Sequence, residues 1–226
     1  MRYLLFLVFF LFCFVLTAQE SLAQSRTIRY VALGDSYTIG TGATPEDSWP
    51  AVLVSRLREK NIPIQLIANL GRAGWTSQNV IDHQLPVCKK LHPDFVTLLI
   101  GVNDWVQGVS EETFRKNIKT LMDDIVTTIP APNSLVVLTI PDFSLTPQGL
   151  LYSGGRNISQ GLAHFNTIIE EEARQRHLPV IDIYTFSQKL GNDPSLVAAD
   201  GLHPSAKAYA LWADFILPQV ERLFSF

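Results

Sequence analysis

Three side chains that together can cleave a carboxylic ester stand at two distant places in this sequence. Ser36 ends a Gly-Asp-Ser tripeptide, and Asp200 and His203 bound an Asp-Gly-Leu-His tetrapeptide. A serine hydroxyl attacks a carbonyl efficiently when a base removes its proton, and histidine has a suitable intrinsic pKa. A carboxylate on the other ring nitrogen holds the imidazole in one tautomer and stabilises its protonated form. The sequence therefore predicts Ser36 as nucleophile, His203 as base and Asp200 as the orienting acid.

The same chemistry needs hydrogen-bond donors for the negatively charged oxygen that forms during the attack. Gly71 suits this role, because a residue without Cβ lets its backbone N–H approach the substrate. Asn103 offers a side-chain amide, and the backbone N–H of Ser36 offers a third donor. Ser36, Gly71 and Asn103 are thus the predicted oxyanion hole, whereas Gly74 is expected to serve the turn.

The elements that must position these residues follow from the hydrophobic pattern. Five short runs are continuously apolar, which is typical of strands buried on both faces of a parallel sheet. The runs cover Ile28–Leu33, Ile64–Ala68, Phe95–Ile100, Leu135–Ile140 and Val180–Ile183. Amphipathic stretches, with apolar residues at spacings of three and four, follow several of these runs. The alternation predicts a three-layer α/β/α domain around a five-stranded, mostly parallel sheet.

The candidate residues stand where such a sheet collects ligands, at the carboxyl ends of its strands. Ser36 follows the first run, Gly71 the second and Asn103 the third, while Asp200 and His203 precede the last helical stretch. We therefore expect residues far apart in the sequence to meet at one edge of the sheet.

Taken in this order, the four polar clusters resemble the sequence blocks of the SGNH, or GDSL, hydrolase superfamily. The resemblance covers nearly all of Ile28–Phe224. The residues that match the family's serine, oxyanion glycine, oxyanion asparagine, acid and base are Ser36, Gly71, Asn103, Asp200 and His203. The resemblance implies hydrolysis of carboxylic esters through an acyl-enzyme, a flavodoxin-like sheet, and neither a metal nor another cofactor.

Two further dipeptides, Trp49-Pro50 and Ile140-Pro141, are similar to those of the bacterial thioesterases, lysophospholipases and arylesterases. This branch implies simple acyl esters, lysophospholipids or acyl-thioesters as substrates. Removal of acetyl groups from carbohydrates is an alternative, since related folds carry out that reaction. A non-catalytic binding module is a second alternative, but a binding role would not require an intact serine, histidine and aspartate.

Aromatic residues near the predicted site indicate where a substrate could bind. Trp75 and Trp105 directly follow the two oxyanion clusters, and the long connection after the fourth run carries Phe143 and Tyr152. Long connections in compact domains are often functional. We expect Trp75, Trp105, Phe143 and Tyr152 to line an apolar acyl or aryl pocket, with packing over the sheet edge as the alternative for the tryptophans.

Composition limits the other partners. The chain has 226 residues and a formal net charge of −3, and it contains no run of Lys or Arg. Nucleic acid binding through a basic stripe and membrane binding through a polybasic patch are therefore not expected. The histidines outside the Asp-Gly-Leu-His cluster are scattered without metal-ligand spacing, so no metal is expected. A small-molecule or lipid ester is the expected partner, and the oligomeric state stays open.

The amino terminus has the pattern of a secretory signal. Arg2 precedes an unbroken apolar run over Leu4–Leu16, and Ser21-Leu22-Ala23 supplies small residues for cleavage after Ala23. The run is too short for a typical membrane span. We therefore predict a signal peptide over residues 1–23 and a secreted or periplasmic hydrolase domain over residues 24–226. An uncleaved signal that anchors the domain to the membrane is the alternative.

Overall fold

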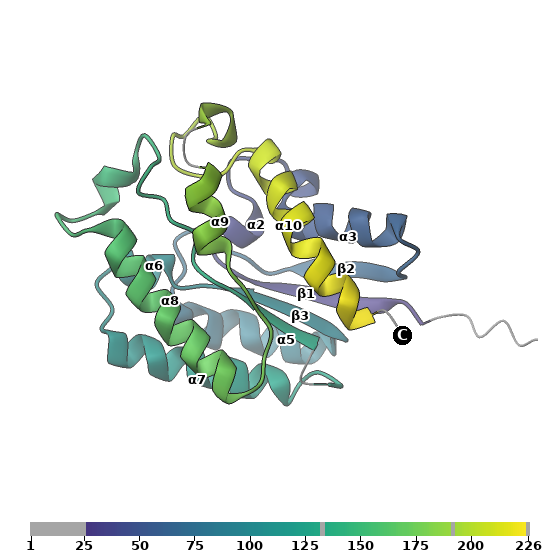
Figure 1. Ribbon diagram of the computed structural model, residues 1–226. Coiled ribbons are helices and arrows are strands. Elements are labelled where there is room, and N and C mark those ends of the chain that lie inside the picture. Colours follow the sequence, from purple (N-terminus) through teal and green to yellow (C-terminus); the bar gives the residue numbers. More distant parts are fainter. Residues whose placement is uncertain (1–25, 132–133, 191–192, 225–226) are drawn as a thin grey trace, which may run out of the picture.

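Five strands form at the five apolar runs (Figure 1). Their bounds are β1 (Ile28–Gly34), β2 (Ile64–Asn69), β3 (Phe95–Leu99), β4 (Leu135–Leu138) and β5 (Val180–Ile181). The computed structural model describes residues 26–131, 134–190 and 193–224. The predicted signal peptide lies outside the described residues.

β3 ends one residue earlier than predicted, and β4 and β5 each end two residues earlier. β5 is short because the start of a helix interrupts it. The side chain of Asp182 accepts a hydrogen bond from the N–H of Thr185 at 2.9 Å. The hydroxyl oxygen of Thr139 accepts from the N–H of Tyr184, also at 2.9 Å. Side-chain acceptors for first-turn N–H groups favour a helix start. Helix α9 (Ile183–Leu190) therefore begins where the apolar run still continues.

The strand order is β2-β1-β3-β4-β5, and every pair is parallel. This confirms the predicted parallel α/β sheet. The chain leaves β1 toward β2 on one side and later returns to β3 on the other, so the order reverses between β1 and β3. Loops diverge at such a point and leave a crevice at the carboxyl ends of the two strands. Ser36 follows β1 and Asn103 follows β3, so both flank this crevice.

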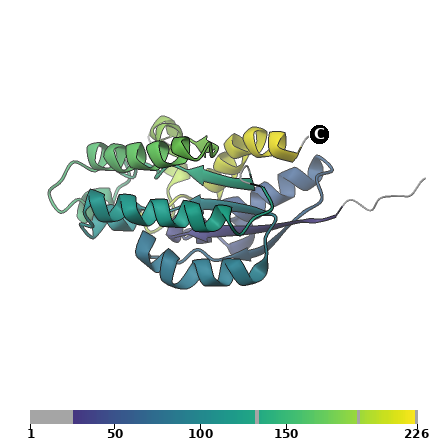
Figure 2. The same cartoon turned by 90° about the horizontal axis from the view of Figure 1, so that it is seen from below.

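Helices cover the sheet in two groups. In Figures 1 and 2, α3 lies beside α10, whereas α7 lies beside α8 and also packs against α5. None of the helices in the described ranges is long and apolar enough to cross a membrane. The helical segments are α2 (Ser36–Ile39), η1 (Pro45–Asp47), α3 (Trp49–Glu59), α4 (Ser77–Asn79), the π-helix η2 (Val80–Gln84), α5 (Leu85–Leu91), α6 (Val102–Val106), α7 (Glu111–Val126), η4 (Gly149–Tyr152), α8 (Ile158–Gln175), α9 (Ile183–Leu190), η5 (Pro194–Leu196) and α10 (Ala206–Phe224).

The core fixes the strands that carry the site. Tyr30 is fully buried in β1, and its hydroxyl forms a 2.7 Å hydrogen bond with the hydroxyl of Thr97 in β3. Phe114 of α7 stacks on Phe165 of α8 with ring centroids 4.4 Å apart. Burial of each such aromatic side chain contributes about 1.5–3 kcal/mol to folding. The strand ends are therefore held by a well-packed interior.

Candidate active site

Ser36 is the first residue of α2, immediately beyond the end of β1. Asp35 caps this helix, because its side chain accepts the N–H of Tyr37 at 3.0 Å. The Ser36 side chain is 6% exposed and faces a pocket. Within the described part of the chain, neither its hydroxyl nor its backbone N–H has a hydrogen-bonded partner. Ser36 thus presents a free hydroxyl and a free N–H at the same helix end.

Asp35 itself is fully buried beside this serine. Burial raises the pKa of Asp35 to about 8, although the hydrogen bond from the Tyr37 N–H acts in the opposite direction. Its second carboxyl oxygen, Oδ2, is buried without a partner among the described residues. The carboxyl group is therefore mostly protonated near neutral pH, and it serves the backbone turn rather than carrying a charge.

Asp200 and His203 meet in the turn that the sequence predicted. The Asp200 Oδ2 lies 2.7 Å from the Nδ1 of His203, and Asp200 Oδ1 accepts the N–H groups of Leu202 and His203 at 2.9 Å each. Burial acts to raise the pKa of Asp200, but these hydrogen bonds outweigh it and hold the pKa below its usual value. The carboxylate therefore stays ionised and fixes both the turn and the imidazole.

Gly201 makes this short turn possible, since its φ of 70° lies in the left-handed region that favours glycine. The turn is held by the N–H of Gly201, which donates to Ala198 at 2.9 Å. Tyr37 lies against the imidazole, with its ring centroid 5.8 Å from that of His203 in an edge-on arrangement. Aromatic contact and hydrogen bonding together hold the His203 ring in one orientation.

One pocket brings Ser36 and His203 together with Asn103, and it is called the serine pocket below. Its lining residues are Ser36, Tyr37, Ala73, Gly74, Val102, Asn103, Val106, Phe143, Tyr152, Leu202 and His203. The structure thus joins loops that follow β1, β2 and β3 with the turn that precedes α10. Within the described residues no hydrogen bond joins the Ser36 hydroxyl to His203, so the two side chains share the pocket without a direct bond.

Asn103 lies in α6, directly beyond β3. Its Nδ2 donates to the backbone carbonyl of Trp75 at 2.9 Å, which uses one amide hydrogen and fixes the orientation of the group. The other amide hydrogen remains available to a ligand in the serine pocket. The next residue, Asp104, is fully buried and accepts the N–H and hydroxyl of Ser77. These bonds tie the loop beyond β3 to the loop beyond β2.

Gly71 does not lie in the serine pocket, contrary to the prediction. Its N–H already donates to the side-chain Oδ1 of Asn69 at 3.1 Å. Its Cα packs against α2, where an added Cβ would lie 2.5 Å from the Ile39 nitrogen and 2.8 Å from the Asp35 carbonyl oxygen. Gly71 is therefore required for close backbone packing beneath the serine, and its N–H points to a different partner.

Gly74, three residues further along the chain, lies at the pocket where Gly71 does not. It lines the serine pocket, is exposed, and its N–H has no acceptor among the residues that the structure describes. Gly71 was the predicted donor and Gly74 was expected only to serve the turn, and no sequence signal pointed to the Gly74 N–H. The choice depends on the path of the backbone, because only that path decides which N–H faces the pocket.

The four aromatic candidates separate into two pairs. Phe143 and Tyr152 line the serine pocket. Trp105 is buried beneath it, where it contacts Phe143 and carries the guanidinium of Arg156 4.1 Å above its ring. Trp75 packs on His83 and lines a different depression beside Gly71. The prediction that the tryptophans line the site with Ser36 is therefore wrong.

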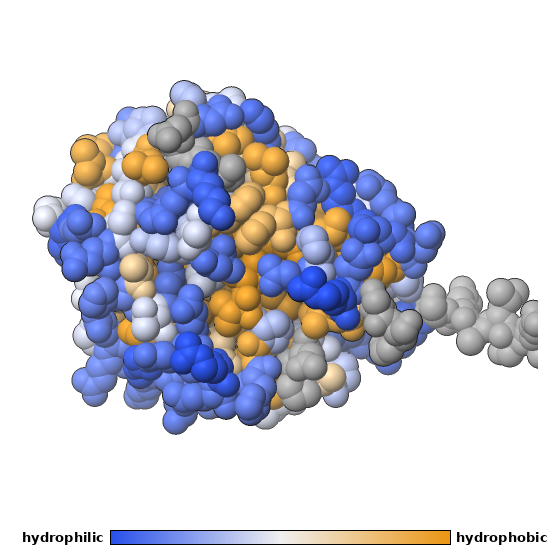
Figure 3. Space-filling view, viewed as in Figure 1, coloured by the Kyte–Doolittle hydropathy of each residue, from blue (hydrophilic) through white to orange (hydrophobic). Residues whose placement is uncertain are grey.

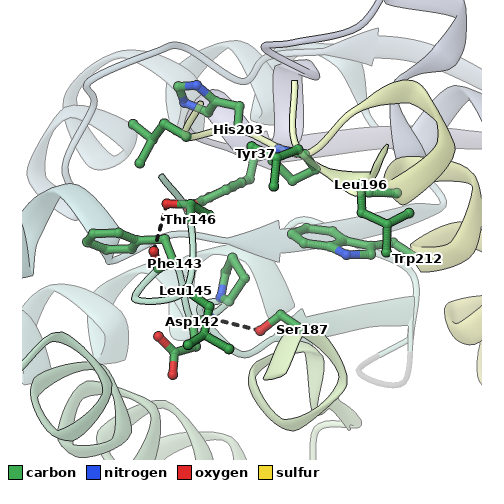
Figure 4. Close-up of a pocket in the computed structure, with 14 residues that line it drawn as sticks. Tyr37, Asp142, Phe143, Leu145, Thr146, Ser187, Leu196, His203 and Trp212 are labelled. Atoms are coloured by element: carbon green, nitrogen blue, oxygen red, sulfur yellow. Dashed lines mark hydrogen bonds between the residues drawn. The ribbon is translucent and has the colours of Figure 1, made fainter. Parts of the chain in front are cut away.

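A second, mostly apolar pocket adjoins the serine pocket on the side of His203 (Figure 4). The two pockets share Tyr37, Phe143, Leu202 and His203. Figure 4 shows the rings of Phe143 and Trp212 on opposite sides of this space, with Leu196 close to Trp212. At its base the N–H of Asp142 donates to the Ser187 hydroxyl at 2.8 Å. Apolar surface thus extends beyond His203.

Comparison with known proteins places this arrangement in a family. The model of the GDSL-like lipase/acylhydrolase family matches residues 32–211, which include every residue of the serine pocket. Thioesterase 1/protease 1/lysophospholipase L1 of Escherichia coli K12 is 23% identical over 214 residues, covering 95% of this chain and 91% of that protein. The arylesterase of Vibrio mimicus is 23% identical over 202 residues, covering 89% and 92%.

Solved structures agree with the fold. The lipase/acylhydrolase from Enterococcus faecalis superimposes with a TM-score of 0.72 at 21% sequence identity, over 88% of this chain and 98% of that chain. Its likeness confirms the α/β architecture with helices on both sides of the sheet. The family match covers most of the chain and confirms the resemblance drawn from the sequence blocks. The chain belongs to the GDSL-like lipase/acylhydrolase family, and it is a carboxylic ester hydrolase of the GDSL type.

Proposed function

We propose that this hydrolase cleaves its ester through an acyl-enzyme on Ser36. His203 takes the proton of the Ser36 hydroxyl as this oxygen attacks the ester carbonyl, and then gives that proton to the leaving alcohol or thiol. Asp200 holds the imidazole through Nδ1 and stabilises its protonated form. Water, activated by His203, then releases the acyl group. The observation that carries the proposal is the shared pocket of Ser36 and His203, with Asp200 2.7 Å from the far ring nitrogen.

In this proposal three hydrogen-bond donors stabilise the negative charge that develops on the carbonyl oxygen. They are the backbone N–H groups of Ser36 and Gly74 and the free amide hydrogen of Asn103. All three residues line the serine pocket, and the Trp75 carbonyl holds the amide in place before substrate arrives. Donors fixed in advance stabilise developing charge without reorganisation during the reaction. Gly74 replaces Gly71 in this role.

Acyl esters with an apolar part, including lysophospholipids and acyl-thioesters, are the proposed substrates. Phe143, Val106 and Tyr152 give the serine pocket an apolar wall, and a second apolar pocket adjoins it at His203. The names of the relatives, a thioesterase/lysophospholipase and an arylesterase, support the same substrate range. Apolar walls favour an acyl or aryl group over a hydrated sugar.

A panel of esters tests this proposal. Acetyl, butyryl, octanoyl and lauroyl esters of nitrophenol are compared with an acetylated sugar, using the parent protein, Ser36→Ala and the control Ser55→Ala on the exposed face of α3. Turnover should fall to background in Ser36→Ala alone and should favour chains longer than acetyl. Activity confined to acetyl groups would indicate carbohydrate O-deacetylation. Parent-like turnover by Ser36→Ala would overturn the assignment of the nucleophile.

We also propose that the domain works outside the cytoplasm, as a secreted or periplasmic enzyme. The support is the signal-like pattern of residues 1–23. Amino-terminal sequencing of the protein from the periplasm or culture fluid should give Gln24 as the first residue. Recovery in the membrane fraction with an intact amino terminus would instead indicate an uncleaved anchor.

A further inference from the structure

One connection gathers most of the exposed apolar side chains of the described residues. Five large hydrophobic residues are exposed, and four of them lie between β4 and α8. We call these four the apolar tip: Leu145 is 55% exposed, Leu150 75%, Leu151 78% and Tyr152 44%. Figure 3 shows apolar atoms at the surface over this connection, at the upper left. Clustered exposed apolar side chains mark an interaction site more often than an accident of folding.

Two anchors fix the connection that carries the tip. On one side the N–H of Gln148 donates to the Gly201 carbonyl at 2.9 Å. On the other side the Arg156 guanidinium donates to the carbonyls of Trp105 at 2.7 Å and Val106 at 3.0 Å. These anchors join the tip to the turn that carries His203 and to the helix that carries Asn103. The leucines are therefore presented in a fixed position relative to the site.

The tip borders the entrance of the serine pocket. Tyr152 belongs to both, since it lines the pocket and is also 44% exposed. Leu150 and Leu151 precede it in the one-turn helix η4. These two leucines line neither the serine pocket nor its apolar neighbour. A substrate presented by an apolar surface would meet the leucines before it meets Ser36.

The charges around the entrance indicate what kind of surface fits. The segments 71–75, 102–109 and 143–157 border the pocket, and their exposed charged residues are Arg72 and Arg156. The carboxylate in these segments, Asp104, is buried. On the remaining side Asp200 is paired with His203. Arg72 and Arg156 form no ion pair with another described residue, and the ionised Asp200 carboxylate, whose side chain is 42% exposed, lies on the His203 side. Exposed leucines beside these two cations match acyl chains beside phosphate groups.

We infer that the apolar tip docks on a phospholipid surface, with Leu150 and Leu151 entering the acyl-chain boundary and the entrance arginines near the phosphates. The inference rests on the proposed ester chemistry at Ser36, because it explains how a lipid-borne ester reaches that serine. Docking then delivers the ester to the pocket without prior release of the whole lipid into water.

Binding is measured first, with catalysis removed. Ser36→Ala protein is floated with vesicles of phosphatidylcholine, and with vesicles of phosphatidylcholine and phosphatidylglycerol. This protein should bind the anionic vesicles more strongly than the neutral ones. Adding Leu150→Ser/Leu151→Ser to Ser36→Ala should weaken the partitioning of the protein onto vesicles at least about tenfold. The matched control adds Val87→Ser, which removes the exposed hydrophobic residue outside the tip and should change nothing. Equal binding by the tip variant, or no binding by Ser36→Ala itself, would overturn the inference.

Activity is measured second, with Ser36 present. Leu150→Ser/Leu151→Ser should hydrolyse a soluble butyryl ester within about twofold of the parent and should lose about tenfold on long-chain lysophosphatidylcholine carried in vesicles. An equal loss of activity on both substrates would show that the tip only stabilises the structure of the active site. If the parent failed on the soluble ester while Ser36→Ala bound vesicles, the proposed function would fail and the docking would stand. A parent dimer that the tip variant converts to monomer would assign the tip to self-association instead.

Discussion

The side-chain amide of Gln84 hydrogen-bonds both backbone groups of Gly34, two residues before Ser36. It accepts the Gly34 N–H at 2.9 Å and donates to the Gly34 carbonyl at 2.7 Å. The paired register between β1 and β2 ends at Ala32, and beyond it the Arg72 N–H also donates to the Gly34 carbonyl, at 3.2 Å. The buried amide of Gln84 supplies the acceptor for the Gly34 N–H. Gln84 reaches this position at the end of a π-helical turn, a rare form often found near functional sites.

Replacing Gln84 should therefore disturb the serine more than the fold. Gln84→Leu leaves the Gly34 N–H buried without an acceptor, which costs about 1–3 kcal/mol of stability. We expect kcat on a soluble ester to fall roughly tenfold or more with little change in KM, since the altered strand end misplaces the Ser36 hydroxyl rather than the pocket wall. Steady-state kinetics and thermal unfolding measure the two effects.

The matched control is Gln78→Leu, which removes an exposed glutamine of the same segment that bonds only to Asp82. It should leave kcat unchanged. If Gln84→Leu lost stability but kept its full kcat, Gln84 would have a structural role alone.

The orienting role of Asp200 predicts a large kinetic effect from a small change. Asp200→Asn keeps the size of the side chain but removes the charge that stabilises the imidazolium, and it disfavours the required tautomer. We expect kcat to fall by about 10⁴, as for the same change in a serine-protease triad. Asp214→Asn is the control, because that carboxylate is exposed on α10 and pairs with Arg56 of α3. A loss below tenfold in Asp200→Asn would contradict the assigned role.

The proposed oxyanion role of Asn103 predicts that its replacement lowers turnover rather than substrate binding. Asn103→Ala removes the amide that faces the serine pocket, and loss of one oxyanion donor costs about 10²–10³ in kcat. KM should change little, because the donor acts mainly on charge that develops in the transition state. Gln160→Ala removes an exposed amide on α8 and serves as the control. A rise in KM with unchanged kcat would show that Asn103 binds the substrate without stabilising the oxyanion.

The raised pKa of Asp35 predicts how the stability of the protein depends on pH. Its folded pKa is about 8, raised by burial from the usual 3.8, so the folded chain keeps a proton that the unfolded chain loses. Its contribution therefore makes the protein less stable as pH rises from about 4 to about 8, by at most about 1.4 kcal/mol per pH unit. Asp35→Asn removes this dependence and retains an acceptor for the Tyr37 N–H.

Urea unfolding of the parent and Asp35→Asn at a series of pH values measures that difference. The free energy of unfolding of the variant, relative to the parent, should increase as the pH rises toward 8 and then level off. A difference that stays constant over this range would show that Asp35 is ionised in the folded protein.

Local sequence patterns were sufficient to predict the positions of the five strands and the turn that joins Asp200 to His203. Continuous apolar runs predict buried parallel strands because both faces of such a strand are covered, whatever the details of the covering helices. The Asp-Gly-Leu-His turn closes within four residues, so its geometry depends little on distant contacts. The end of β5 was misplaced because Thr139, which supports the start of α9, comes from the distant segment that follows β4.

Choices between neighbouring candidates needed the tertiary structure. Gly71 and Gly74 are equivalent in sequence terms, but contact with α2 confines Gly71 while Gly74 remains at the pocket. Trp105 and Phe143 are both large and aromatic, yet of the two only Phe143 lines the serine pocket, while Trp105 is buried and packs against Arg156.

The sequence by itself determined that Ser36 and Asn103 follow strand ends and that Asp200 and His203 share a turn before the last helix, since residue types and the period of the apolar pattern are local properties. Tertiary structure decided which backbone N–H and which aromatic rings share the pocket with them. It also placed Gln84 against Gly34, 50 residues away in the chain. These relationships depend on contacts between segments distant in sequence, and the direction in which a side chain or N–H points is fixed only when those segments pack.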